Sequence, residues 1–231
     1  MKTKSDVIVL FLGVLFLSQL VLSNPVMAGS TMISAAGDNC FVLKSDGTLW
    51  AWGANNKGQL GDGTTTSRPS PAQIGTDKDW VSIATGTYMG AYVFALKTDG
   101  TTWGWGNNEF SQLGDGTNKN KPSPARIGTV KEWLLIAPGN AHTLGLKSDG
   151  TIWAWGLNNT GQLGDGTTVD KPSPVQIGTD NDWVSFTKGT AHTIALKKNG
   201  TLWAWGANTY GQLGDGTTVN KNTPIQIGDK W

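Results

Sequence analysis

The sequence predicts an all-β chain whose strands form the blades of a β-propeller. A segment with a Trp-x-Trp-Gly pair followed by Gly-Asp-Gly-Thr occurs four times, and a fixed period of this length indicates a repeat architecture. The second tryptophan of the pair stands at 52, 105, 155 and 205, so the intervals are 53, 50 and 50 residues. The 231 residues also include 32 glycines and 12 tryptophans, a composition typical of short strands joined by tight turns around an aromatic core.

The repeats divide residues 29–231, the predicted propeller domain, into four units with one plan. Each unit opens with a short apolar strand, passes a glycine into a second apolar strand and then turns at Asp-Gly or Asn-Gly. These dipeptides favour a type I′ hairpin, because both central residues of that turn need positive φ. The expected units are about 30–80, 81–133, 134–183 and 184–231.

The third strand of each unit carries the tryptophan pair. Residues two apart in a strand point to the same side, so Trp50 and Trp52 should face one neighbouring blade. Leu49 and Ala51 should then face the other neighbour. We therefore expect the tryptophans to be core residues rather than a sugar-stacking surface.

A long loop follows the third strand and leads to a short fourth strand. We expect a proline such as Pro71 to be the first residue of that strand, because proline cannot donate a ladder hydrogen bond. The segment Ala72-Gln73-Ile74 would form the strand, and a closing tryptophan such as Trp80 would end the unit. Four short strands in a repeat of this length are typical of a propeller blade.

Residues 1–28 have the pattern of a secretory signal peptide. Lys2 and Lys4 precede the 16-residue apolar run 7–22, and Val26-Met27-Ala28 offers small or apolar residues for cleavage after Ala28. A retained membrane anchor is the alternative, but 16 apolar residues are few for a span of about 20. We predict an exported protein without membrane contact once the signal is removed.

Charge and cysteine usage narrow the range of partners. Removal of residues 1–28 lowers Lys plus Arg from 18 to 16 and Asp plus Glu from 17 to 16, which leaves a formally neutral chain. Nothing in this balance attracts a polyanion, so we do not expect nucleic acid as a partner. Cys40 is the single cysteine and cannot form an internal disulfide; its apolar strand predicts a buried side chain.

The repeat itself resembles a known family. Residues 142–156 read His-Thr-Leu-Gly-Leu-Lys-Ser-Asp-Gly-Thr-Ile-Trp-Ala-Trp-Gly, and Gly-Gln-Leu-Gly-Asp-Gly-Thr follows. This string is similar to the repeat of the regulator of chromosome condensation (RCC1) family, and the likeness extends over all four units. It implies a β-propeller, usually of seven blades, and the exported chain would be a secreted, bacterial-type member.

Four units in place of seven predict a partial ring. After the signal, the chain begins in the phase in which it ends, so its ends could meet within one chain, between copies, or within a longer protein. An open arc would expose apolar blade faces, and such faces favour self-association.

The resemblance implies two activities that differ from simple scaffolding. The family is known for nucleotide exchange on a small nuclear GTPase, which we do not expect of an exported chain without a dedicated insertion. Secreted bacterial relatives include a propeller that inhibits β-lactamases through aromatic loops, and this remains an alternative.

The residues give no pattern of a catalytic or metal site. The four aspartates of Gly-Asp-Gly-Thr are equivalent, and such residues commonly cap their own turns, whereas acid–base catalysis needs carboxylates in unlike surroundings. His142 and His192 share one repeat position and have no third zinc ligand nearby in sequence. We expect no enzyme activity, cofactor or metal. The four aspartates are Asp62, Asp115, Asp165 and Asp215.

Positions where the repeats differ are the candidate binding residues. The residue before Gly/Ser-Gln-Leu-Gly varies most, and loops on a rigid scaffold commonly carry function. Exposed aromatic residues are typical interface anchors. We therefore predict protein–protein interaction through the propeller-face loops, with a carbohydrate or cell-wall binding module as the alternative. The candidates are Lys57, Phe110, Thr160 and Tyr210 at the variable position, Glu109 beside it, and Tyr88 and Met89 in a short insertion.

Overall fold

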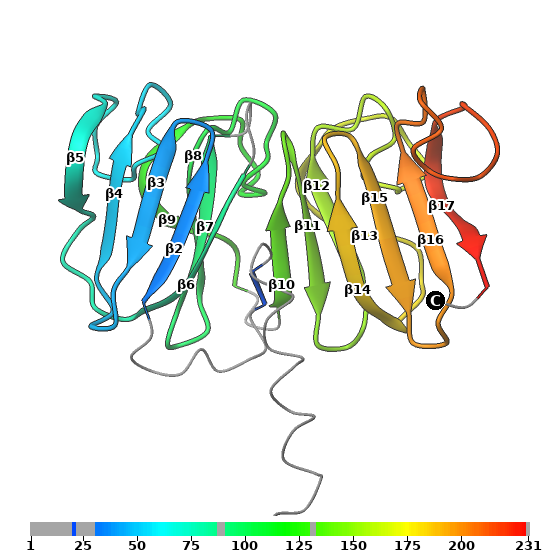
Figure 1. Cartoon of the computed structure of the whole chain (residues 1–231), viewed down its shortest axis with the longest axis horizontal. Helices are drawn as coiled ribbons and strands as arrows, with labels where there is room; N and C mark the ends of the chain where they lie inside the picture. The colour runs from blue at the N-terminus through cyan, green and yellow to red at the C-terminus, as the bar shows by residue number, and fades with distance from the viewer. Residues whose placement is uncertain (1–19, 22–30, 87–90, 130–132, 230–231) are drawn as a thin grey trace, which may run out of the picture.

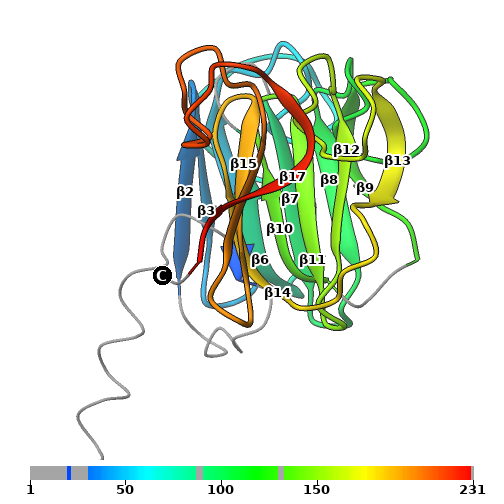
Figure 2. The same ribbon diagram turned by 90° about the vertical axis from the view of Figure 1, so that its right-hand side faces the viewer.

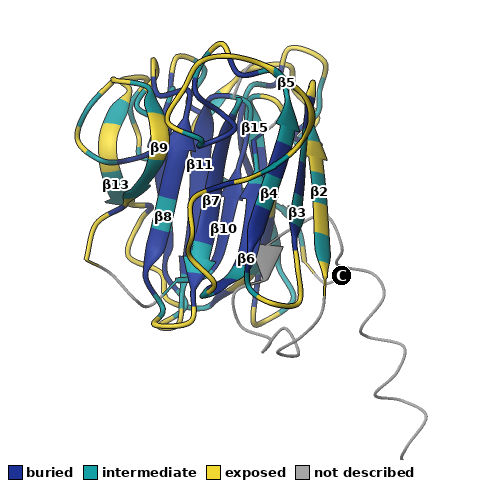
Figure 3. Cartoon of the chain, turned by 90° about the vertical axis from the view of Figure 1, so that its left-hand side faces the viewer, coloured by how far each residue is buried: buried dark blue, intermediate teal, exposed yellow. Residues whose placement is uncertain are grey.

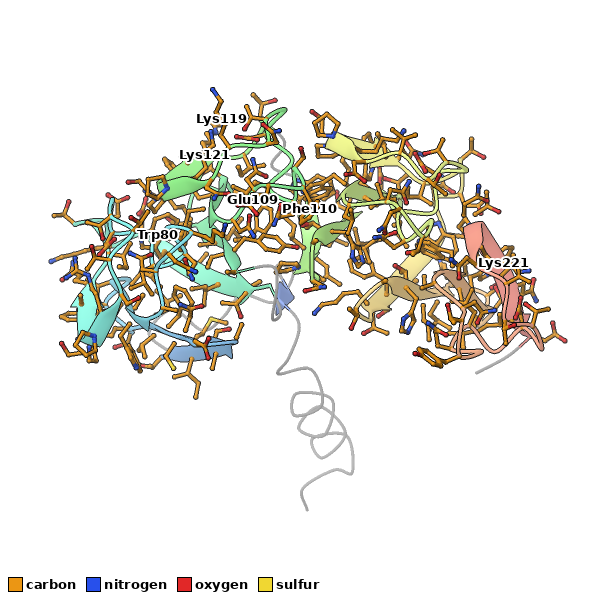
Figure 4. The ribbon with its side chains drawn as sticks, turned by 90° about the horizontal axis from the view of Figure 1, so that it is seen from above. Trp80, Glu109, Phe110, Lys119, Lys121 and Lys221 are labelled. Carbon is orange, nitrogen blue, oxygen red and sulfur yellow. The ribbon has the colours of Figure 1, made fainter. Side chains whose placement is uncertain are left out.

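Four antiparallel sheets of four repeat strands each stand side by side in an arc (Figure 1). The computed structural model describes residues 20–21, 31–86, 91–129 and 133–229. All regular secondary structure within these ranges is β-strand. The sheets are propeller blades in a partial ring, with the first and fourth blades at opposite ends of the arc (Figure 4). The prediction of an all-β, four-bladed partial propeller is confirmed.

Within each blade the four strands lie side by side in chain order, from an inner strand to an outer strand. The first blade contains β2 (Met32–Ala36), β3 (Asn39–Leu43), β4 (Leu49–Gly53) and β5 (Arg68–Gln73). The second contains β6 (Trp80–Thr85), β7 (Tyr92–Lys97), β8 (Thr102–Gly106) and β9 (Lys121–Arg126). The third contains β10 (Trp133–Pro138), β11 (His142–Lys147), β12 (Ile152–Gly156) and β13 (Lys171–Gln176). The fourth contains β14 (Trp183–Lys188), β15 (His192–Lys197), β16 (Leu202–Gly206) and β17 (Lys221–Gly228).

A short fifth strand joins the third blade from the N-terminal segment. The backbone of β1 (Leu20–Val21) pairs antiparallel with β10, with Leu20 opposite Ile136 and Val21 opposite Leu135. Cleavage after Ala28 would remove this strand. The cleavage itself stays a prediction. The described ranges contain no helix with the length and hydropathy of a membrane span.

The hairpin turns and two strand boundaries differ from the prediction. At the Asp-Gly and Asn-Gly turns only the glycine has positive φ, +78° at Gly47, so these turns are not of type I′. Trp80 does not end the first unit's sheet but opens β6 of the next blade. The outer strand of the first blade begins at Arg68 and contains Pro71 in its interior. An outer edge tolerates proline, because its N–H side needs no partner. The pairing of β4 with β5 also shifts register after Ala51, which accommodates the extra residues as a bulge does.

Side chains from facing blades form the core. Leu49 and Ala51 of the first blade pack in one cluster with Trp105 of the second, so the predicted division of the two strand faces is confirmed. Trp105, Trp155 and Trp205 are at most 1% exposed. In Figure 3 most of the strands of the second and third blades are dark blue, because each of these blades lies between two neighbours.

The first blade lacks a neighbour on one side, and its tryptophan face differs accordingly. Trp52 is only half-buried, although its equivalents in the other blades are fully buried. Cys40 on the same face is also half-buried, so its predicted burial is wrong. Burial at this face depends on a preceding blade, and the described residues contain no blade before the first repeat.

In the second, third and fourth blades, two tryptophan rings pack edge to face at the end opposite the long loops. In the second blade, the rings of Trp80 and Trp103 meet edge to face with centroids 5.9 Å apart. The Lys97 ammonium lies 4.7 and 4.8 Å from these two ring centroids, within cation–π range. Asp77 accepts a hydrogen bond from the same ammonium at 2.6 Å. In the fourth blade, Lys197 repeats this arrangement with Trp183, Trp203 and Asp180.

One buried asparagine organises each long loop after the third strand. In the first blade, Asn55 Oδ1 accepts the Leu60 N–H at 2.9 Å. Its Nδ2 donates to Asp62 Oδ1 and to the Thr64 carbonyl, both at 3.1 Å. The same bonds recur around Asn108, Asn158 and Asn208.

The aspartate of Gly-Asp-Gly-Thr is part of this loop network. Asp115 Oδ1 accepts both the N–H and the hydroxyl of Thr117, at 2.9 and 2.8 Å, and Lys121 Nζ lies 2.9 Å from its other oxygen. Burial raises the pKa of Asp115, but the hydrogen bonds from Lys121 and Thr117 outweigh it and hold the pKa below its usual value. Turn capping by these aspartates agrees with the prediction. The other three pairs are Asp62 with Arg68, Asp165 with Lys171 and Asp215 with Lys221.

We predict that Asn158→Ala lowers the free energy of unfolding by about 2–4 kcal/mol, because it leaves the buried Leu163 N–H without an acceptor and frees the loop. Asn159→Ala is the matched control: Asn159 is the exposed next residue, and its loss should cost less than about 1 kcal/mol. Urea denaturation followed by tryptophan fluorescence measures both. Equal losses would contradict the organising role of Asn158.

Candidate functional site: the loop face

The long loops after the third strands emerge at one end of all four blades (Figure 1). We call this end the loop face; it comprises residues 54–67, 107–120, 157–170 and 207–220. Since the asparagine network fixes each loop from inside, side chains that point outward are presented on a rigid backbone.

The variable position is held in the same way in every repeat. The glutamine two residues further on turns back, and its Oε1 accepts the backbone N–H of the variable residue. The side chain at this position is therefore free to differ while the backbone stays the same. The four N–H to Oε1 distances are 2.8 Å for Lys57 to Gln59, 2.9 Å for Phe110 to Gln112, 2.9 Å for Thr160 to Gln162 and 2.8 Å for Tyr210 to Gln212.

The two aromatic candidates project from the surface. Tyr210 is 92% exposed and Phe110 is 41% exposed. Thr160 differs, because its hydroxyl donates to Gln162 Oε1 at 2.7 Å and closes its own turn. Tyr88 and Met89 lie outside the described residues.

Lys57 and Glu109 connect the loops of the first and second blades. Lys57 Nζ lies 2.5 Å from Glu109 Oε1, and the hydrogen bond from Lys57 holds the pKa of Glu109 below its usual value. Figure 4 shows Glu109 and Phe110 together, closer to the middle of the arc than Lys119 and Lys121. The structure thus brings Lys57, Glu109 and Phe110 into one region, while Thr160 and Tyr210 occupy the loops of the third and fourth blades.

A polar cavity of about 210 Å³ adjoins Lys57 between the first and second blades. Asn39, Asn56 and Asn107 are among its lining residues. These groups can donate and accept hydrogen bonds, so the cavity could receive a polar side chain of a bound partner.

Ser111, next to Phe110, has a backbone conformation that sequence reasoning missed. Its φ is +58°, in the left-handed region that favours glycine. The equivalent residues of the other blades are glycines with φ between +71° and +78°: Gly58, Gly161 and Gly211. A serine in place of glycine in one repeat was the available signal, and it marks the Phe110 turn as the strained one of the four.

The two histidines are the first residues of β11 and β15, the second strands of their blades, and are not among the candidate residues. His142 is 1% exposed, and neither ring nitrogen has a hydrogen-bond partner among the described residues. Burial, with smaller contributions from Lys188 and His192, lowers the pKa of His142 to about 4, so the ring is neutral at neutral pH. Across the described ranges, no three His, Cys, Asp or Glu side chains gather in a group that could hold a metal ion.

Four-stranded blades in an arc, with organised loops at one end, define the chain as a β-propeller repeat protein. The repeat pattern described as "Regulator of chromosome condensation (RCC1) repeat" matches residues 46–93, 99–146, 149–196 and 199–230. The chain belongs to the RCC1 repeat family.

Relatives by sequence share the repeats over part of their length. Protein RCC2 of Homo sapiens is 35% identical over 108 residues, which are 44% of this chain and 20% of that protein. Probable E3 ubiquitin-protein ligase HERC3 of Homo sapiens is 32% identical over 114 residues, which are 48% of this chain and 11% of that protein. The matched part is therefore a small fraction of these longer proteins.

Solved structures show the same fold. Prp20p from Saccharomyces cerevisiae has a TM-score of 0.74 at 23% identity, covering 85% of this chain and 50% of that one. Human WBSCR16 has a TM-score of 0.71 at 25% identity, covering 87% of this chain and 53% of that one. The four blades thus superimpose on about half of each of these larger chains.

We predict that stability falls as the pH is lowered from 6.5 to about 4. In this window the unfolded chain protonates His142, whereas the folded chain keeps it neutral, so the unfolded state binds more protons. The loss should reach at most about 3 kcal/mol. His142→Asn, which introduces the residue found at this position in the first repeat, should flatten the dependence.

Denaturant titrations at several pH values measure this effect. His192→Asn is the matched control, because His192 is half-buried and its pKa is also lowered by burial, so its removal should flatten the curve less. If wild type and His142→Asn have the same pH slope, the assignment to His142 is wrong.

Proposed function

We propose that this chain is a non-catalytic scaffold that binds a protein partner through its loop face. The observation that carries the proposal is the variable position, where one glutamine holds the backbone in all four repeats while the side chain changes. A fixed backbone with differing side chains is suited to recognition, because little conformational entropy is lost on binding.

The exposed side chains indicate what kind of surface the partner has. Phe110 and Tyr210 are large rings held outside the core, and aromatic residues commonly supply most of the binding energy of an interface. The Lys57–Glu109 pair lies beside Phe110 and adds one charge of each sign. A partner with an apolar pocket and a polar rim fits this arrangement.

We further propose that the scaffold is exported. The support is the N-terminal pattern of lysines, apolar run and small residues before the position after Ala28. Intact mass spectrometry of the protein from the exported fraction of its host tests this directly, since cleavage shortens the chain by 28 residues. An unprocessed chain that stays in the cell would contradict export.

For binding, we predict that Phe110→Ala and Tyr210→Ala each weaken capture of the partner at least about tenfold. The immobilised full chain captures proteins from the exported fraction, mass spectrometry identifies the enriched protein, and calorimetry with that purified protein gives the affinities. Lys119→Ala is the matched control, because Lys119 is exposed in the loop that carries Phe110 but lies away from the variable position (Figure 4).

Two results would overturn the loop-face proposal. One is unchanged affinity in both aromatic variants while the partner still binds. The other is the absence of any captured protein together with a change of tryptophan fluorescence on adding soluble glycans, which would favour a carbohydrate-binding module.

A further inference from the structure

The three contacts between neighbouring blades use one repeated plug and socket. The plug is the second tryptophan of the following blade, and the socket is the Gln-Leu-Gly turn in the loop of the preceding blade. Each indole N–H donates to the glutamine carbonyl of the socket. The distances are 3.1 Å for Trp105 to Gln59, 2.9 Å for Trp155 to Gln112 and 3.1 Å for Trp205 to Gln162.

The glycine of each socket makes room for the indole. A Cβ added at Gly61, Gly114 or Gly164 would lie only 2.6–2.7 Å from the nearest indole atom, closer than any real Cβ contact. A side chain at this glycine therefore cannot coexist with the seated tryptophan unless the blades move apart.

A second hydrogen bond joins the same blades further out. The N–H of the glycine two residues after the socket glycine donates to a carbonyl of the following outer strand. The three bonds, each 2.8 Å long, run from Gly63 to Pro122, from Gly116 to Pro172 and from Gly166 to Asn222.

The fourth blade presents an empty socket. A Cβ added at Gly214 would meet nothing within 4 Å, in contrast to its three equivalents. The sheet face below this turn is also uncovered: Leu202 and Ile227 are half-buried, whereas the corresponding Ile152 and Ile177 of the third blade are at most 1% exposed. Figure 2 shows the fourth blade at this end of the arc.

The first blade presents a free plug at the other end. Trp52 is half-buried, whereas the equivalent Trp105, Trp155 and Trp205 are at most 1% exposed. Ile33 on the same face is 81% exposed, although the residues at its position in the other blades are buried. Those residues are Ile83, Ile136 and Phe186, which are 5%, 1% and 2% exposed.

We propose that a second copy of this chain fills both ends, so that two copies close a ring of eight blades. Trp52 of each copy enters the Gly214 socket of the other, with its indole N–H donating to the Gln212 carbonyl. The Gly216 N–H donates to the Pro69 carbonyl, as in the three internal contacts. The occupant is a second copy because the chain itself carries the surface that its open socket fits. This proposal does not depend on the loop-face partner.

Geometry supports a closed pair rather than an open chain of copies. A head-to-tail contact forms a ring when its rotation closes, and propellers contain four to eight blades. Eight blades, four from each copy, lie within this range.

Light scattering after size-exclusion chromatography of the full chain tests the proposal. We expect twice the mass of one chain, which is 24.5 kDa before any processing. Gly214→Ala should raise the dissociation constant of the pair at least about tenfold, because each of the two contacts then has a side chain against Trp52.

Gly216→Ala is the matched control for backbone strain. Gly214 and Gly216 have φ of +74° and +77°, so alanine strains both positions alike. At the internal equivalents of Gly216, an added Cβ would lie 3.5–3.8 Å from its neighbour, an ordinary contact, so this variant should still pair. Circular dichroism confirms that both variants are folded.

Ile33→Asn provides a second test that leaves a single copy intact. Ile33 is exposed in one copy, so the change should not unfold the chain, but pairing would bury the amide and should weaken at least about tenfold. The proposal is wrong if the wild-type chain has the mass of one copy, if it forms species larger than two copies, or if Gly214→Ala and Gly216→Ala pair equally well.

Discussion

The contact between a tryptophan and the Gln-Leu-Gly turn of the preceding blade is the interaction on which the rest of the structure depends. The indole fills the space that the glycine leaves open, and its N–H satisfies a buried carbonyl that water cannot reach. A single four-stranded sheet cannot bury its own apolar faces. Each blade is therefore stabilised by a neighbour that covers its tryptophan face, its leucine face or, in the two interior blades, both.

This constraint separates the framework from the variable surface. The tryptophans, the loop asparagines and the aspartates each serve one blade contact or one loop, and their repetition follows from the repetition of the blades. The side chain at the variable position contributes little to that framework, because the loop holds it through its backbone N–H. Phe110 and Tyr210 can thus differ from Lys57 and Thr160 without altering the fold, which is how a repeat scaffold acquires a specific surface.

The same constraint makes the two ends of the arc chemically complementary. Every interior blade has a covered plug face and a covered socket face, whereas the first and fourth blades each leave one uncovered. Identical local contacts thus account for the stability of the interior and for the exposure of Ile33 and Trp52 at one end. The ends differ from the interior in their neighbours and not in their residue types.

Most of the fold could be predicted from sequence because its signals are local. The Asp-Gly hairpins, the alternation of Leu49 and Trp50, and the turn-capping role of Asp115 depend on residues a few positions apart. The variable position could be predicted as well, since the repeats can be compared with one another. The proline-containing outer strand was misplaced, because only its edge location makes proline acceptable there.

Only the tertiary structure decided the features that depend on residues distant in sequence, namely blade membership and burial. Trp80 belongs to the second blade because its ring packs on Trp103, which no local pattern reveals. Cys40 has an apolar strand around it and is still half-buried, since burial requires an adjacent blade. The sequence by itself determined the blade, because hydrogen bonding and alternation within a unit are short-range. The arrangement of blades determined which of these identical surfaces are covered, because burial is a property of the assembled neighbours.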